Sequence, residues 1–120
     1  MALARTDLSA VTQIGAGASS AVVTGAGNTV FIKSVQFYNL DQSNDQNVTI
    51  YIVPGSGAGV GYGSTTNAIA RIGLGTDDTF FYEPAYPITL QKDSNDCLAV
   101  LNEGNTGNSI NVYVSGDMEV

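Results

Sequence analysis

Hydrophobic and polar residues alternate with a period of two over much of the chain, a pattern typical of half-buried β-strands. The clearest alternation lies in residues 88–90, 98–100 and 110–114, where Ile, Leu or Val occupies every second position. Val30–Leu40 and Asn47–Val53 are especially dense in β-branched and aromatic residues. No helical period extends beyond a few residues. The pattern therefore predicts an all-β protein.

Clusters of Gly, Pro, Asn and Asp separate the predicted strands at intervals of roughly 8 to 12 residues, the spacing of a sandwich or barrel. About eight strands are typical of a two-sheet antiparallel β-sandwich, and we expect a jelly-roll-like arrangement. The glycine-rich segment Pro54–Gly63 is predicted to be a flexible surface loop. The predicted strands are Ser20–Gly25, Val30–Leu40, Asn47–Val53, Asn67–Leu74, Asp77–Glu83, Tyr86–Lys92, Asp96–Asn102 and Asn108–Ser115.

The two strongest strands carry further local information. Neither face of Val30–Leu40 is apolar throughout, which predicts a β-bulge near Lys33 or Ser34. The polar segment 41–46 is typical of a turn, so Val30–Leu40 and Asn47–Val53 are predicted to form a hairpin. Both faces of Asn47–Val53 are largely apolar, and we expect one face to meet the core and the other another subunit.

The N-terminal residues differ in composition from the rest of the chain. Residues 1–28 are rich in Ala, Ser, Thr and Gly, and we expect an N-terminal arm with one short strand before a β-sandwich domain of residues 29–120. The arm is expected to order when it grips a neighbouring subunit. Arg5 and Asp7 precede any apolar run, so no signal peptide is predicted, and no apolar stretch approaches the ~20 residues of a membrane span.

Composition removes several classes of function. Charged residues make up 12% of the chain and the net charge is −7, with four widely separated basic residues. Nucleic acid and anionic membrane are therefore not expected as partners, because both need clustered Lys and Arg. The absence of His excludes Ser-His and Cys-His dyads and imidazole ligands. Cys97 lies in an apolar run and is predicted to be a buried thiol.

Three weaker motifs favour ordinary loops over functional sites. Asp41–Asp45 places oxygen ligands at alternate positions, but Gln46 and Ile52 replace the Gly and Glu of a calcium loop, so an Asx-rich turn is favoured. Residues 57–61 lack the glycine spacing of a dinucleotide site, and no helix follows. Asp77-Asp78 is interpreted as a solvated turn, because the chain has no Trp and few clustered aromatic residues for a sugar-cleaving cleft. No catalytic residue, cofactor or metal is predicted.

Six segments together carry a resemblance to a known group of proteins: Leu8–Gly15, Ser19–Thr24, Asn28–Val35, Phe37–Asn39, Val48–Pro54 and Ile110–Gly116. With these segments the chain resembles the small β-sandwich virion proteins of tailed bacteriophages, which include capsid decoration (cement) proteins and tail accessory proteins. The motifs chiefly encode strands and turns, and no catalytic residue accompanies them.

This resemblance implies a structural role without enzymatic activity. The implied protein is made in the bacterial cytoplasm and sits on the capsid exterior as a homotrimer bound to the major capsid protein. Two alternatives stay open: a tail or baseplate accessory protein, and a lectin-like module that binds a host glycan. Low charge and many tyrosines are typical of a chain that makes interfaces. The residues expected to contact capsid or subunits are Leu3, Leu8, Val11, Ile14, Val22, Tyr51 and Tyr113.

Overall fold

The structure is a computed structural model that describes residues 3–25, 27–55, 66–104 and 109–119. Most of the glycine-rich segment lies outside these residues. Within them, every regular element is a strand. The ten strands are β1 (Leu3–Asp7), β2 (Thr12–Ile14), β3 (Ser19–Thr24), β4 (Val30–Asn39), β5 (Gln46–Val53), β6 (Ala68–Leu74), β7 (Thr79–Tyr82), β8 (Ile88–Leu90), β9 (Cys97–Asn102) and β10 (Ile110–Glu119).

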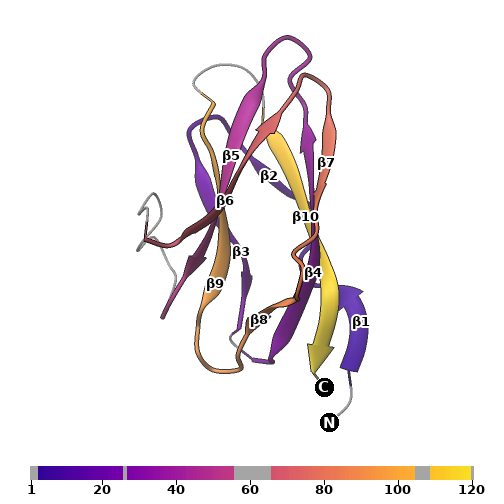
Figure 1. Cartoon of the computed structure of the whole chain (residues 1–120), viewed down its shortest axis with the longest axis vertical. Helices are drawn as coiled ribbons and strands as arrows, with labels where there is room; N and C mark the ends of the chain where they lie inside the picture. The colour runs from indigo at the N-terminus through magenta and orange to yellow at the C-terminus, as the bar shows by residue number, and fades with distance from the viewer. Residues whose placement is uncertain (1–2, 26, 56–65, 105–108, 120) are drawn as a thin grey trace.

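The described strands form two antiparallel sheets that pack face to face as a β-sandwich (Figure 1). Sheet A has the order β1-β10-β4-β7, with β2 also paired to β10 and β8 also paired to β4. Sheet B has the order β3-β9-β5-β6. The predicted all-β class and two-sheet sandwich are therefore confirmed.

The N-terminal residues belong to the sheets, whereas the sequence suggested an arm with one strand. β1 and β2 both run antiparallel to β10, from Leu3 opposite Glu119 to Ile14 opposite Ile110. Ile14 lies in the main core, and its carbonyl accepts a hydrogen bond of 3.2 Å from the Asn102 side chain of sheet B. These contacts anchor the segment in a way that its small-residue composition does not reveal.

The predicted hairpin between the two strongest strands is wrong. β4 pairs with β10, β7 and β8 in sheet A, whereas β5 pairs with β6 and β9 in sheet B. Segment 40–45 crosses from one sheet to the other. Asn39 holds this crossing: its Nδ2 donates to the carbonyls of Asn44 (3.1 Å) and Gly75 (2.9 Å), and its Oδ1 accepts from the N–H of Asp41. A turn of this composition suits either connection, so the pairing of β4 and β5 with strands of different sheets decides between them.

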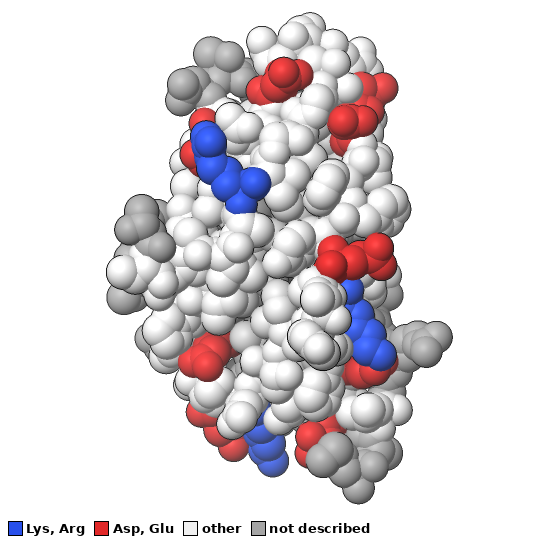
Figure 2. Space-filling model, viewed as in Figure 1, with Lys and Arg blue, Asp and Glu red and all other residues white. Residues whose placement is uncertain are grey.

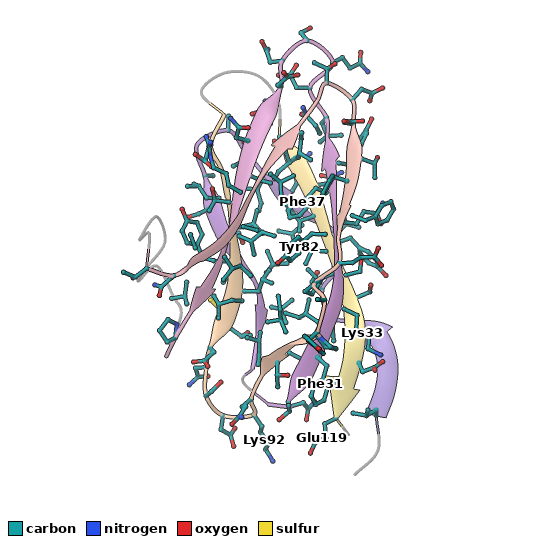
Figure 3. All side chains as sticks on the ribbon, viewed as in Figure 1. Phe31, Lys33, Phe37, Tyr82, Lys92 and Glu119 are labelled. Atoms are coloured by element: carbon teal, nitrogen blue, oxygen red, sulfur yellow. The ribbon has the colours of Figure 1, made fainter. Side chains whose placement is uncertain are left out.

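The predicted bulge is confirmed at Lys33. Ser34 pairs with Ser115 and Ile32 pairs with Gly116, so Lys33 is the extra residue on β4. The bulge places Val30, Ile32, Val35 and Phe37 on the same, inward face of β4 despite their uneven spacing. Figure 3 shows Phe37 and, from β7, Tyr82 directed into the space between the two sheets.

The core has two parts. The main cluster fills the space between the sheets and contains inward residues of both, among them Phe37, Ile50, Leu98 and Val112. A second, smaller cluster lies on the opposite face of sheet B and contains Tyr51, Val53, Cys97 and Ala99, with Leu101 packed against it. Cys97 is fully buried, as predicted.

Candidate functional site

The structure separates the seven predicted contact residues. Ile14, Leu8 and Val22 contribute to the main core or pack against it, and Tyr51 is only 5% exposed in the second cluster. Ile14 and Tyr51 are buried within the chain, whereas Leu8 and Val22 are half-buried. Leu3 and Val11 are more than half exposed, and Tyr113 is half-buried on the outer face of sheet A. The exposed part of the prediction therefore falls on two surfaces.

The first surface lies at the end of the molecule where the N-terminus meets the C-terminal part of β10 (Figure 1). Among the described strands, β1 pairs only with β10, so none of them pairs with its other edge. Beside it is a recess of about 390 Å³ whose lining includes Leu8, Val22 and Met118. Leu3, at the start of β1, exposes 55% of its surface. We call this surface the N-terminal end.

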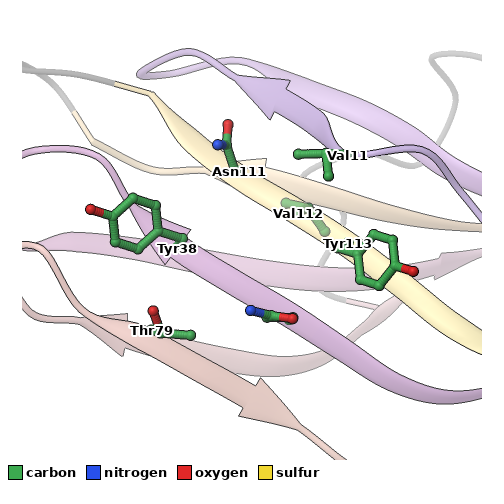
Figure 4. A pocket seen from close by; sticks show the side chains of 7 residues that line it. Val11, Tyr38, Thr79, Asn111, Val112 and Tyr113 are labelled. Carbon is green, nitrogen blue, oxygen red and sulfur yellow. The ribbon is translucent and has the colours of Figure 1, made fainter.

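The second surface is a groove of about 400 Å³ on the outer face of sheet A (Figure 4). It lies over β10 and β4, bounded by the first residue of β7 and by Val11, just before β2. Its lining residues are Val11, Gln36, Tyr38, Thr79, Asn111, Val112 and Tyr113.

Strand pairing arranges the side chains of this face in two rows. Asn111 of β10 lies opposite Tyr38 of β4, which lies opposite Thr79 of β7. In the next row Tyr113, Gln36 and Phe81 stand opposite one another in the same way. Paired residues share a face of the sheet, so amides and hydroxyls alternate with aromatic rings. We call these six residues the grid.

The bulge at Lys33 determines the chemistry of the grid. Strict alternation from the inward Ile32 would direct Gln36 and Tyr38 into the core and Val35 out to solvent. One extra residue on β4 reverses this assignment, because the side-chain period of a strand is two. The extra residue, Lys33, therefore lets β4 place apolar side chains in the core and at the same time directs the Gln36 amide and the Tyr38 phenol outward.

Tyr38 is held in place by a neighbouring turn. Its hydroxyl donates a hydrogen bond to Oδ1 of Asp77. This hydrogen bond, with smaller effects from burial and from the carboxylate charge, raises the pKa of Tyr38 above its ordinary value of 10.0. Asp77 is exposed and has a φ of 54°, in the left-handed region that Asp tolerates better than most residues. The predicted solvated turn at Asp77-Asp78 is confirmed, and it also orients one side of the grid.

Charged groups lie near both surfaces: β10 carries Asp117 and Glu119 at the N-terminal end, and Asp77 borders the groove. On the face visible in Figure 2, basic groups lie beside acidic ones, with wide uncharged areas between these groups. On sheet A, Lys33 pairs with Asp117 at 2.6 Å. On sheet B, Arg71 Nε donates to Glu103 at 3.0 Å, and Thr49 also donates to this carboxylate, which lowers the pKa of Glu103.

The described residues hold no group of three or more His, Cys, Asp or Glu side chains arranged to bind a metal ion. The Asp41 carboxylate accepts from the N–H groups of Ser43 and Asn44, which makes the predicted Asx-type turn, within a sheet-to-sheet crossing. In the described part of the chain no helix is long and apolar enough to cross a bilayer.

The grid combines residues that the sequence did not single out. Gln36, Tyr38, Thr79, Phe81 and Asn111 were not predicted as site residues. Their signal in the sequence was present in part, since polar and aromatic residues alternate with buried ones along β10 and along β4 after the bulge. What the sequence lacked was the pairing of β4 with β10, which joins segments about 75 residues apart.

Comparison with known proteins gives no match: no family model, no curated protein and no solved structure matches the chain.

Proposed function

We propose that this chain is a structural virion protein of a tailed bacteriophage, a capsid decoration protein that bridges subunits of the major capsid protein. The observation that carries the proposal is the N-terminal end, where one edge of β1 is unpaired by any described strand and Leu8, which directly follows β1, lines a recess of mixed apolar and polar character. An open edge binds an extended segment of another chain through backbone hydrogen bonds, and the recess accepts its apolar side chains.

The strand order supports a jelly-roll assignment within this proposal. β1 with β2 occupy one position beside β10, and β7 with β8 occupy one position beside β4, so each sheet has four positions. Eight positions in two sheets, with most connections passing between the sheets, are typical of jelly rolls, which include viral capsid domains.

The proposed mechanism is mechanical. The protein acts on the capsid exterior as a homotrimer, and weak contacts from several copies add up across neighbouring capsid subunits. Synthesis takes place in the host cytoplasm. No enzymatic step, cofactor, nucleic acid or membrane enters the proposal.

The proposal is tested on particles purified from the bacterium or phage that encodes the chain. Gold-labelled antibody against the chain is expected to mark the heads, and pre-immune serum serves as the control. Label confined to tails or baseplates would favour the tail accessory alternative. Particles free of the chain by labelling and by mass spectrometry would contradict a virion role.

A pair of variants tests the contact surface. Leu3→Asp places a charge at the N-terminal end and is expected to abolish rebinding to heads stripped of the protein. Ile69→Asp is the matched control, because Ile69 is 44% exposed on β6 of the other sheet. If the two variants rebind equally, the capsid contact does not include Leu3 of β1.

A further inference from the structure

The groove on the outer face of sheet A lies on a different surface from the proposed capsid contact and differs from it in chemistry. The described residues that line it supply two amides, three hydroxyls and two aromatic rings, and none of them is charged. Amides both donate and accept hydrogen bonds, and tyrosine joins a flat apolar ring to a polar tip. The groove therefore offers paired donors and acceptors next to ring faces.

The dimensions of the grid fit a small polar ligand. Neighbouring strands lie about 4.8 Å apart and alternate residues along a strand about 6.8 Å apart. Two rows over three strands thus cover roughly 10 by 7 Å, about the footprint of a disaccharide. The groove volume, about 400 Å³, is in the range of small-molecule sites.

The grid is largely preorganised. Tyr38 and Tyr113 stand diagonally across β4 and β10, the two central strands of sheet A. The bond from Tyr38 to Asp77 fixes one ring. The sheet fixes the backbone positions of the other grid residues, so binding a ligand there needs little ordering of the main chain.

We propose that this groove binds a neutral carbohydrate. Sugar hydroxyls match the amides of Gln36 and Asn111, and the C–H faces of a sugar ring stack on Tyr38 and Tyr113. Anionic ligands are not favoured, because none of the described residues that line the groove is a Lys or Arg that could pair with them. Apolar peptides would leave its amides without partners at a cost of about 1–3 kcal/mol each.

The first experiment screens the full-length protein on a printed array of neutral and acidic microbial oligosaccharides and polysaccharides. Saturable binding to neutral glycans is expected. The site is then located by titrating ¹⁵N-labelled protein with the strongest neutral oligosaccharide, which should shift backbone resonances of β4 and β10 around the grid. Binding to acidic glycans alone, or a blank array, would overturn the proposal.

Variants connect the binding to the groove. Tyr113→Ala and Asn111→Ala are each expected to raise the Kd at least tenfold. Their matched controls, Tyr86→Ala and Gln42→Ala, remove exposed side chains outside the groove and should change the Kd less than twofold. Gln36→Glu keeps the side-chain shape, so it provides a variant that folds if an alanine variant does not, and it should also weaken binding. Glycan binding that survives all three groove changes would place the site elsewhere and overturn the proposal.

A second copy of the chain is the competing occupant. Light scattering behind a sizing column decides this: a multimer that Tyr113→Ala converts to monomer would make the groove a subunit interface and overturn the glycan assignment. The glycan proposal is independent of the virion assignment. Particle labelling tests whether the chain belongs to the virion, whereas the glycan experiments test ligand binding in the groove, so either proposal can fail without the other.

Discussion

The outer faces of the two sheets differ sharply in exposure. On sheet B, Tyr51, Val53, Cys97 and Ala99 form a cluster that is 0–5% exposed within the single chain. On sheet A, the grid leaves amides, hydroxyls and rings half-buried or exposed over a groove. The inner faces of both sheets are apolar, but β5 and β9 of sheet B carry apolar residues on both faces, whereas apolar residues alternate with polar and aromatic ones along β10 of sheet A. The centre of the sheet B face is therefore covered within the chain, whereas the centre of the sheet A face is open to a partner.

The difference predicts how each face tolerates a charge. Ala99→Asp would bury an unpaired carboxylate in the sheet B cluster and should lower the free energy of unfolding by about 3 kcal/mol or more. Gln36→Glu adds a carboxylate of nearly the same shape on the open face and should change it by no more than about 0.5 kcal/mol. Urea denaturation measures both. Similar stability of the two variants would contradict the comparison.

The bulge that creates the open face is a second point of weakness. A Cβ at Gly116 would lie 2.0 Å from the backbone carbonyl oxygen of Phe31, so one of the two strands must move. Gly116→Ala should therefore lower the free energy of unfolding by about 3 kcal/mol. Gly27→Ala is the control, since a Cβ there meets no heavy atom of the described residues within 4 Å. Its expected effect is within about 0.5 kcal/mol.

Loss of the bulge would also change the chemistry of the open face. If Gly116→Ala folds with β4 in a regular register, Gln36 and Tyr38 must exchange sides with their neighbours. Such a variant would lose the raised pKa of Tyr38. A variant as stable as the parent, with this pKa unchanged, would show that the bulge accepts a side chain at position 116 and would contradict the steric argument.

The edge of the sheet B face carries a smaller, pH-dependent effect. Hydrogen bonds from Arg71 and Thr49 lower the pKa of Glu103 below its ordinary value of 4.5. A lowered pKa stabilises the folded state above the unfolded value, and this contribution is lost as the pH falls through the folded pKa. The stability difference between the parent and Glu103→Gln should therefore be present at pH 7 and shrink below pH 4.5. A difference that is constant with pH would contradict this account.

The smallest expected effect is spectroscopic and belongs to the sheet A face. Because the Tyr38 hydroxyl donates to Asp77, its pKa lies above 10.0. This bond stabilises the fold below pH 10 and ceases to do so as the pH rises through the folded pKa. Asp77→Asn, which tolerates the positive φ, should shift ionisation of one tyrosine toward pH 10. The absorbance difference between parent and variant at 295 nm measures the shift. Identical titrations would show that Asp77 does not hold Tyr38.

The sequence by itself determined the local features. Alternation predicted the all-β class, the apolar run around Cys97 predicted a buried thiol, and the mixed faces of Val30–Leu40 predicted the bulge. These features depend on neighbouring residues along one strand, so a period of two is enough to predict them. The strands β1 and β2 were not predicted because they are only five and three residues long and because Ala4 and Asp7 of β1 are of types depleted in strands. Their pairing with β10 stabilises them as strands.

Only the tertiary structure decided which strands became neighbours. Segment 40–45 joins β4 to β5 across the sandwich, and the hydrogen bond from Asn39 to Gly75, a residue 36 positions away, helps to hold this crossing. The groove arises in turn because β10 pairs with β4 and aligns Tyr113 with Gln36. Such strand pairings depend on how much apolar surface segments far apart in the sequence bury together. The local pattern of hydrophobic and polar residues does not contain this information. The strands and their alternation are therefore properties of the sequence, whereas the open face and its grid are properties of the fold.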